Sequence, residues 1–217
     1  MKKTKALILA LCAVVLVAVS VMGTLAYLTD SEEVVNTFTV GNVDIKLDET
    51  DVDEKGEPIQ GAERVKENEY HLIPGGEYVK DPTVTVVKGS EEAYLRLLVT
   101  ISDIADLKAV FGNDFLPENY VEGWDKAVWN CAKITDNGDD TVTYEFRYHK
   151  TVDAYKATED VVLEALFTKI KVPAQLDGEE LKAISEMKVT VVGNAIQKAG
   201  FDSADAAWTA FDAQVKP

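Results

Sequence analysis

The residue types that most often carry catalysis are scarce in this chain. Its 217 residues include two histidines, His71 and His149, and two cysteines, Cys12 and Cys131. Neither histidine belongs to an H-E-x-x-H pair, and the sequence has no serine-hydrolase elbow, P-loop or dinucleotide fingerprint. Because a metal site needs several convergent ligands, we interpret each lone histidine as a surface or strand residue. The sequence therefore predicts no catalytic residue and no zinc-protease site.

Carboxylates are abundant, and two clusters of them could bind calcium. The first cluster contains Asp51 and Asp53, and the second contains Asp136 and Asp140. Calcium prefers carboxylate oxygens, but neither cluster has the spacing of an EF-hand loop, which needs a bidentate glutamate at its twelfth position. We therefore favour solvated loops, keep calcium as the alternative, and predict no other cofactor.

The charge and cysteine content point to an acidic protein without an internal disulfide. The formal net charge is −16. Such a charge repels nucleic acid and anionic lipid, so neither is an expected partner. It favours solubility in an extracellular medium, and the alternative is association of subunits bridged by divalent ions. Cys12 lies in an apolar run near the start, and Cys131 is interpreted as a small buried hydrophobe.

The elements that must position these residues are mainly β-strands. In residues 141–149, apolar residues from Val142 to Tyr148 alternate with polar residues from Thr143 to His149, which predicts one face in the core and one in water. Short helices are predicted at 103–111, at 179–186 and after Asp202 or Ser203. Strands are predicted at 37–47, 82–88, 93–102, 124–134, 141–149, 165–172 and 187–196. We expect an antiparallel β-sandwich of jelly-roll type with a few short helices.

The first 26 residues have the arrangement of a secretory signal peptide, predicted as an N-terminal signal helix. Three lysines precede an apolar run at residues 6–22. Thr24 and Ala26 are small enough for a signal-peptidase site, so we predict cleavage after Ala26, with Tyr27 as the second choice. An uncleaved anchor is the alternative, because the run approaches the length of a membrane span. Residues 27–217 would then form a single domain.

Two stretches near this site carry a resemblance to a known family. Residues 23–30 read GTLAYLTD, and residues 36–45 read NTFTVGNVDI. Together they resemble the signal and first strand of the TasA/camelysin family of exported proteins. The turn sequence LIPGG at residues 72–76 resembles the L-x-P-G turn of that family, and residues 166–173 and 189–200 are similar to later strands of related proteins.

The resemblance implies a jelly-roll domain that a Gram-positive bacterium secretes with the help of a SipW-type signal peptidase. Members of the family form biofilm-matrix fibres, in which the N-terminal segment of one subunit adds as a strand to the next. Here that segment would be residues 27–40, with Phe38 and Val40 as strand-donor side chains. We therefore expect a structural protein that self-associates in the extracellular matrix or at the cell surface. It would contact the membrane only through the uncleaved signal.

Two other classes of function stay open at this point. Camelysin itself is described as a metal-dependent protease that cleaves casein, but the absence of a zinc motif argues against carrying that activity over. A secreted ligand-binding module would use exposed aromatic side chains such as Tyr120, Trp124 and Trp129. We favour the interpretation that these aromatic residues belong to the core.

Overall fold

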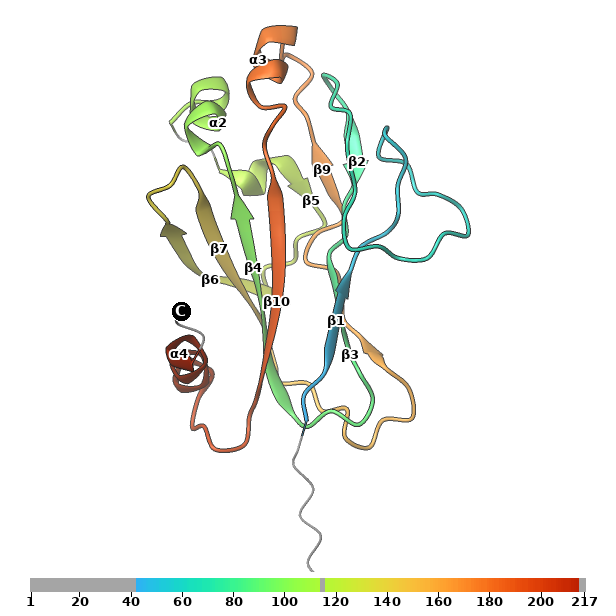
Figure 1. Ribbon diagram of the computed structural model, residues 1–217, viewed down its shortest axis with the longest axis vertical. Coiled ribbons are helices and arrows are strands. Elements are labelled where there is room, and N and C mark those ends of the chain that lie inside the picture. The colour runs from blue at the N-terminus through green and yellow to red at the C-terminus, as the bar shows by residue number, and fades with distance from the viewer. Residues whose placement is uncertain (1–41, 114–115, 215–217) are drawn as a thin grey trace, which may run out of the picture. The chain divides into compact units, whose positions relative to one another are not determined.

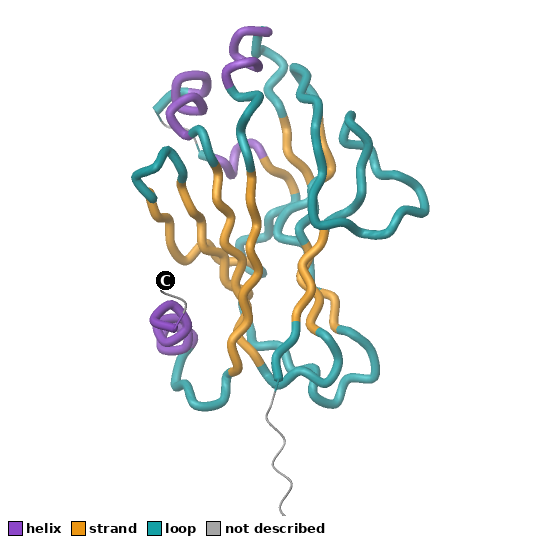
Figure 2. The backbone as a smooth tube through the Cα atoms, in the orientation of Figure 1, coloured by secondary structure: helices purple, strands orange, loops and turns teal. Residues whose placement is uncertain are grey.

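A computed structural model describes residues 42–113 and 116–214, which form mainly antiparallel β-structure (Figures 1 and 2). The predicted signal peptide, the cleavage residues Ala26 and Tyr27, and the strand-donor residues Phe38 and Val40 lie outside the described residues. Within the described ranges, no helix combines the length and the apolar character needed to cross a bilayer.

Ten strands in the described part of the chain form three antiparallel sheets. Their bounds are β1 (Ile45–Asp48), β2 (Glu77–Val79), β3 (Thr83–Val86), β4 (Ala93–Ile101), β5 (Val121–Glu122), β6 (Trp129–Asp136), β7 (Val142–Tyr148), β8 (Val161–Val162), β9 (Lys169–Lys171) and β10 (Val189–Gln197). The largest sheet has the strand order β10-β4-β7-β6. The two others have the orders β1-β3-β8 and β2-β9-β5.

The core lies between the four-stranded sheet and the two three-stranded sheets (Figure 1). Alternate residues of each strand face it, as the period of two in a β-strand requires. The buried residues include Leu95, Leu97, Val99 and Ile101 from β4, Phe146 and Tyr148 from β7, and Val84 and Val86 from β3. This confirms the predicted inward face of residues 141–149 and the predicted strands in residues 82–88 and 93–102.

The helices are short, and most of their predicted ends are confirmed. They are α2 (Ile104–Phe111), the 3-10 helix η1 (Pro117–Tyr120), α3 (Gly178–Ala183) and α4 (Ala204–Gln214). The hydroxyl of Ser203 accepts a hydrogen bond from the Ala206 N–H at 3.2 Å and caps α4, as predicted. Ser102 or Asp103 is the N-cap that the sequence predicts for α2, and Asp103 does occupy that position, but with a left-handed φ of 55° and without a capping hydrogen bond from its side chain. The carboxylate of Asp140 accepts from the Ala105 N–H instead, at 2.9 Å.

The outer face of the four-stranded sheet is not simply in water, which corrects the prediction for β7. Glu145 of β7 is only 8% exposed, and Arg96 of β4 is 4% exposed. The Arg96 guanidinium lies 4.5 Å from the centre of the Trp208 ring of α4 and forms an ion pair with Asp212 at 2.5 Å. Arg147 forms ion pairs with Glu145 and with the start of α4. A helix from the far end of the chain therefore covers this face, which strand periodicity alone could not reveal.

Several predicted segments differ in extent from the structure; the strand predicted at 124–134, for example, begins at Trp129 and ends at Asp136. The strand predicted at 37–47 lies partly outside the described residues. Within the described part, residues 42–44 are not in a strand, and β1 begins at Ile45. The strand predicted at 165–172 is reduced to β9. The solvated loop predicted around Asp51 and Asp53 is partly in the core, because it buries Glu49, which is 5% exposed, and Val52.

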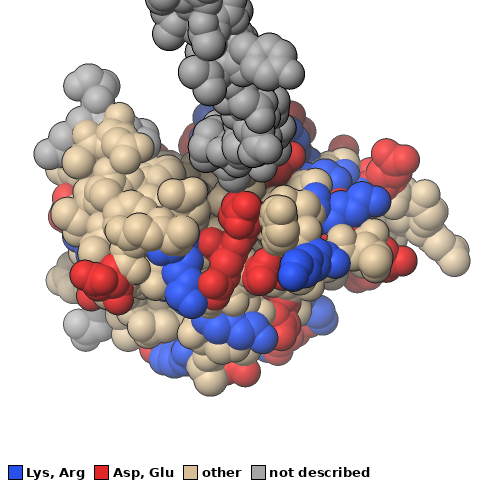
Figure 3. Space-filling view, turned by 90° about the horizontal axis from the view of Figure 1, so that it is seen from below, with Lys and Arg blue, Asp and Glu red and all other residues tan. Residues whose placement is uncertain are grey.

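Charged side chains of both signs are interspersed on the lower face of the molecule (Figure 3). Among the described residues, acidic and basic side chains form exposed ion pairs such as Lys46 with Asp160 and Lys198 with Glu92, each at 2.9 Å. The visible part of this face therefore presents acidic and basic groups together rather than a field of one sign.

Candidate strand-acceptor groove

Two sheet edges face each other at β1 and β10. Each is the outermost strand of its sheet, and no strand pairing joins the two among the described residues. They are nevertheless neighbours, because a β-carbon at Gly193 of β10 would lie 3.5 Å from Ile45 Cδ1 and 3.7 Å from Leu47 Cβ. Figure 1 shows the two strands running side by side. The two sheets thus meet at a seam that no backbone ladder closes.

The strand register identifies which backbone groups of β10 point into this seam. Residues of β10 pair with β4 so that Lys188 lies opposite Ser102 and Lys198 lies opposite Glu92, and both pairs are joined by backbone hydrogen bonds of 3.1 and 2.7 Å. In an antiparallel ladder, bonded and non-bonded positions alternate. The even-numbered residues of β10 therefore bond to β4. The odd-numbered residues direct their N–H and C=O groups away from it: Val189, Val191, Gly193, Ala195 and Gln197.

The same reasoning applies to β1. The Val87 N–H donates to the Asp44 carbonyl at 3.0 Å, which fixes the even-numbered residues of β1 as the ones bonded to β3. Ile45 and Leu47 therefore direct their backbone groups toward the seam. Glu49, the next odd-numbered residue, exchanges two backbone hydrogen bonds with Val65, each 2.8 Å long, so the open edge ends there.

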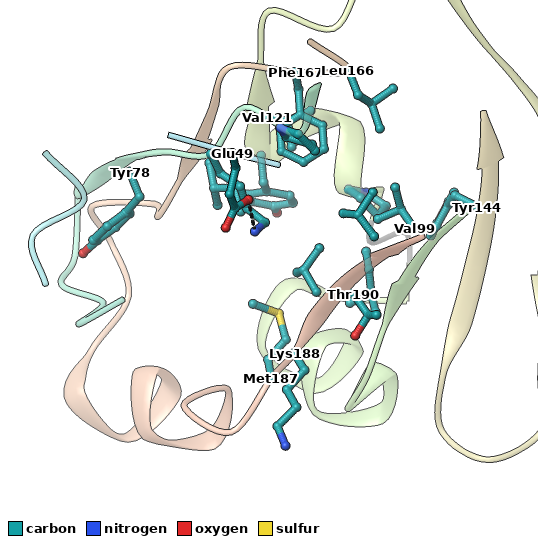
Figure 4. Close-up of a pocket in the computed structure, with 18 of the residues that line it drawn as sticks. Glu49, Tyr78, Val99, Val121, Tyr144, Leu166, Phe167, Met187, Lys188 and Thr190 are labelled. Carbon is teal, nitrogen blue, oxygen red and sulfur yellow. Dashed lines mark hydrogen bonds and ion pairs between the residues drawn. The ribbon is translucent and has the colours of Figure 1, made fainter. Parts of the chain in front are cut away.

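A large cavity lies behind the seam. Its volume is about 1570 Å³, and it is lined by residues of all three sheets and of the loops between them. Figure 4 shows Val99 and Tyr144 on one side of this space, Val121 and Phe167 on another, and Glu49 with its hydrogen bond near its middle. The side chains of Ile45, Leu47, Val189 and Val191 are partly buried against the core on the same side. The groove combines apolar walls with unpaired strand edges.

The two outer strands of the four-stranded sheet are protected to different degrees. Proteins protect exposed edges with charged residues, prolines and bulges, because a bare edge pairs readily with another chain. β6 has a bulge between Cys131 and Lys133, and it carries the charges of Lys133 and Asp136. β10 pairs without irregularity over nine residues, and its sequence VTVVGNAIQ contains no charge and no proline. The edge at the groove is therefore the unprotected one.

A buried ion pair lies in the wall of the cavity. Lys80 Nζ is 2.7 Å from Glu49 Oε2, and the two side chains are 9% and 6% exposed. The Asn68 amide donates to Glu49 Oε1 at 2.9 Å, and Lys80 lies 5.7 Å from the centre of the Tyr70 ring. Burial, together with the negative charge of Glu49, raises the pKa of Tyr70. This cluster keeps a polar centre inside an otherwise apolar space.

A second set of polar contacts holds the loop that carries this wall. Arg64 binds Asp48 at 2.5 Å and Asp81 at 3.0 Å, and Thr50 donates its N–H and hydroxyl to the Asp81 carboxylate at 2.6 and 2.8 Å. Burial opposes ionisation of Asp81, but the hydrogen bonds from Thr50 and Arg64 outweigh it and hold the pKa of Asp81 below its usual range. The loop after β1 is thereby fixed to β3 and forms a rigid side of the groove.

The candidate calcium ligands form hydrogen bonds in separate turns. Asp53 accepts from the N–H groups of Lys55 and Glu57, Asp136 accepts from that of Gly138, and Asp140 caps α2. Asp51 is half-buried, and its backbone carbonyl accepts from the N–H of Ile59. Within the described residues, no three His, Cys, Asp or Glu side chains gather in a way that could hold a metal ion. Calcium binding stays a prediction for solution experiments.

The other residues singled out in the sequence lie mostly in structural positions. Trp129 is fully buried, and its ring N–H donates to the Glu164 carbonyl at 2.9 Å. Trp124 is half-buried and donates to the Trp129 carbonyl at 2.8 Å. Cys131 is a half-buried free cysteine at the cavity, and burial raises the pKa of its thiol. The His149 ring contacts the Val128 carbonyl at 3.3 Å, and His71 is exposed. These residues do not converge on one site.

No protein-family model, curated protein or solved structure matches the chain. The function is therefore argued from the groove itself. Sequence reasoning missed the groove and its ion pair. The only available signal was the long uncharged strand at 189–197, whose place at a sheet edge depends on the fold.

Proposed function

We propose that this chain is a secreted structural subunit that assembles into extracellular fibres by strand addition. In this proposal the signal peptide is removed near Ala26 by a SipW-type signal peptidase of a Gram-positive bacterium. The segment from residue 27 to residue 40 of one subunit then enters the groove of the next, with Phe38 and Val40 directed into the cavity. The fold is proposed to be a jelly-roll β-sandwich that each added strand completes.

The observation that carries this proposal is the unprotected edge of β10 above an apolar cavity. Backbone hydrogen bonds along an edge supply affinity for an extended segment, and pockets for alternate side chains supply specificity. Residues 34–40 read VVNTFTV, a sequence without charge or proline and rich in β-branched residues. Such a segment suits an edge that lacks protective charges of its own.

The width of the seam limits where a strand can enter. A strand that pairs on both sides needs its neighbours about 9.5 Å apart, which is twice the usual strand spacing. Cα atoms of β1 and β10 approach within 8 Å, and Ile45 and Leu47 both lie beside Gly193. We therefore place the added strand along β10 from Gly193 toward Val189, where the cavity-lining residues continue into the segment 184–188 that follows α3 and into the loop 66–70.

Assembly of this kind is head-to-tail. The described chain begins at the end of the domain opposite α3 (Figure 1). A donor segment that leaves one subunit near Asn42 and enters another near α3 joins two different surfaces. Contacts between different surfaces generate open filaments when the rotation does not close a ring. A fibre is therefore the expected product.

A proline substitution at the open edge tests the proposal. Proline removes a backbone N–H, and it is tolerated at strand edges where that N–H is unpaired. Val191→Pro should prevent strand addition while the pairing of β10 with β4 is kept. Ile134→Pro is the matched control, because the pairing of Asn137 with Thr141 places the Ile134 N–H on the outer edge of β6. Val191→Ala controls for the lost side chain and keeps the N–H.

The measurement is fibre formation by the purified mature chain, residues 27–217, followed by electron microscopy and sedimentation. The native chain, Ile134→Pro and Val191→Ala should form fibres, and Val191→Pro should stay monomeric with an unchanged far-ultraviolet spectrum. Equal assembly of Val191→Pro and the native chain would refute strand addition at β10. A native chain that stays monomeric at all concentrations would refute the fibre function.

A further inference from the structure

The buried ion pair in the groove has hydrogen-bonding capacity beyond the bonds it makes. An ammonium group has three N–H donors, and a carboxylate offers about four acceptor sites. Within the described part of the chain, Lys80 and Glu49 share one hydrogen bond, and Glu49 accepts a second one from Asn68. The pair lines the cavity and is more than nine-tenths buried. It can therefore take a further polar group that enters the groove.

The chemistry of the pair selects the kind of group that fits. Lys80 and Glu49 neutralise each other, so a charged newcomer would be an uncompensated charge in an apolar space, which is strongly unfavourable. A primary amide suits the pair, because its oxygen accepts a hydrogen bond and its nitrogen donates two. The oxygen would bind the ammonium of Lys80, and the nitrogen would bind the carboxylate of Glu49.

The segment proposed as the added strand has one amide at a suitable position. Side chains alternate between the two faces of a strand, so Val34, Asn36, Phe38 and Val40 share one face. That face is apolar except for Asn36. The opposite face carries Glu33 and two threonines, which suit water better than an apolar cavity.

We infer that the Glu49–Lys80 pair sets the register of subunit association by binding the Asn36 amide of a second copy of the chain. This inference rests on the proposed fibre function. A shift of the added strand by one residue would turn Glu33 toward the cavity, since a one-residue shift exchanges the two faces. A shift by two residues would set Val34 or Phe38 against the ion pair and leave the amide among apolar groups. Each alternative register leaves buried polar groups unpaired.

Four mature chains, each spanning residues 27–217, test the inference: the native chain, Asn36→Leu, the double variant Glu49→Leu/Lys80→Met, and the triple variant that combines them. Replacing a buried ion pair by apolar residues of similar volume is often neutral for folding, so the double variant should fold. Circular dichroism and a thermal melt check this. Thr37→Val, on the opposite face of the same strand, is the control for altered composition. The readout is the critical concentration for fibre formation.

In the native chain and the triple variant the added strand and the groove match in polarity, so both should assemble readily. In Asn36→Leu and in the double variant one side is polar and the other apolar, so both should assemble poorly. The single and double variants should each raise the critical concentration about tenfold or more. Asn36→Leu covers the unused donors and acceptors of the ion pair with an apolar group, and the double variant leaves the Asn36 amide among apolar groups. The triple variant and Thr37→Val should stay within about threefold of the native chain. Asn36→Leu fibres that form as readily as native ones, or a triple variant no better than the single one, would overturn the register role and leave the fibre function standing. A native chain that forms no fibres would overturn both proposals.

Discussion

Substitution of Lys80 by methionine should destabilise the folded chain strongly, although it changes no residue of the apolar core. Lys80→Met keeps most of the side-chain volume and removes the ammonium that lies 2.7 Å from Glu49. Glu49 then stays 5% exposed with the Asn68 amide as its remaining hydrogen-bond donor among the described side chains. Removing one partner of a buried pair typically costs about 3–5 kcal/mol, because the other charge is left uncompensated.

The magnitude can be checked by urea unfolding of the mature chain at a concentration below that needed for assembly. A loss of this size corresponds to a fall in Tm of about 6–20 °C for a domain of this length. Glu49→Leu/Lys80→Met should recover most of the loss, since the double substitution removes the isolated charge.

Lys126→Met is the matched control for loss of a lysine charge. The Lys126–Glu118 pair has a distance of 3.1 Å, but its side chains are 67% and 40% exposed. Exposed pairs contribute at most about 1 kcal/mol. If Lys80→Met costs no more than Lys126→Met, the ion pair in the cavity is more hydrated than its burial indicates, and the reasoning is wrong.

Three further predictions follow from contacts described above. Deletion of residues 27–36 from the mature chain should abolish the fibres seen by electron microscopy; unchanged fibres would exclude this segment as an essential part of the added strand. Arg96→Lys should loosen α4, because lysine cannot reproduce the contact of the guanidinium with the Trp208 ring or its paired bonds to Asp212. The expected signs are a red shift of tryptophan fluorescence and a loss of about 1–2 kcal/mol in the free energy of unfolding. The pKa of Asp81 is lower in the folded chain than in the unfolded chain, so the unfolded chain binds a proton more readily near pH 4. The ionised Asp81 carboxylate therefore stabilises the fold above the ordinary aspartate pKa. This stabilisation is lost as the pH falls through the pKa that Asp81 has in the folded chain. The dependence of Tm on pH between 6 and 3 should be shallower in Arg64→Met than in the native chain, and identical slopes would contradict the assignment.

The local patterns of the sequence predicted most of the strands and turns. Residues 93–102 and 187–196 became β4 and β10, and the turn at residues 72–76 is confirmed by a 3.0 Å hydrogen bond from the Gly76 N–H to the Ile73 carbonyl. Val189, Val191 and Ala195 are partly buried against the core, as alternation along one strand face requires. These features depend on residues close in sequence, where side-chain period and turn chemistry act directly.

The candidate site could not be predicted in the same way, because it depends on contacts between distant residues. Periodicity shows which faces a strand has, but it does not show which strand lies at the edge of a sheet. Glu49 and Lys80 are separated by 31 positions, and each was one charge among many in the sequence. Arg96 and Asp212 are separated by 116 positions, so the cover over the outer face of β4 and β7 was equally hidden.

The hydrogen bonds that hold the start of β1 have a mechanical consequence. The Glu91 N–H bonds to the carbonyl of Asn42, the Val87 N–H bonds to that of Asp44, and the ladder continues along β3. In an antiparallel ladder these bonds lie across the strands. Tension drawn through the N-terminal segment of a fibre subunit would therefore run along β1 and load its bonds in shear. They would have to break together rather than one at a time, so this joint would resist pulling far better than a strand that is peeled from its end.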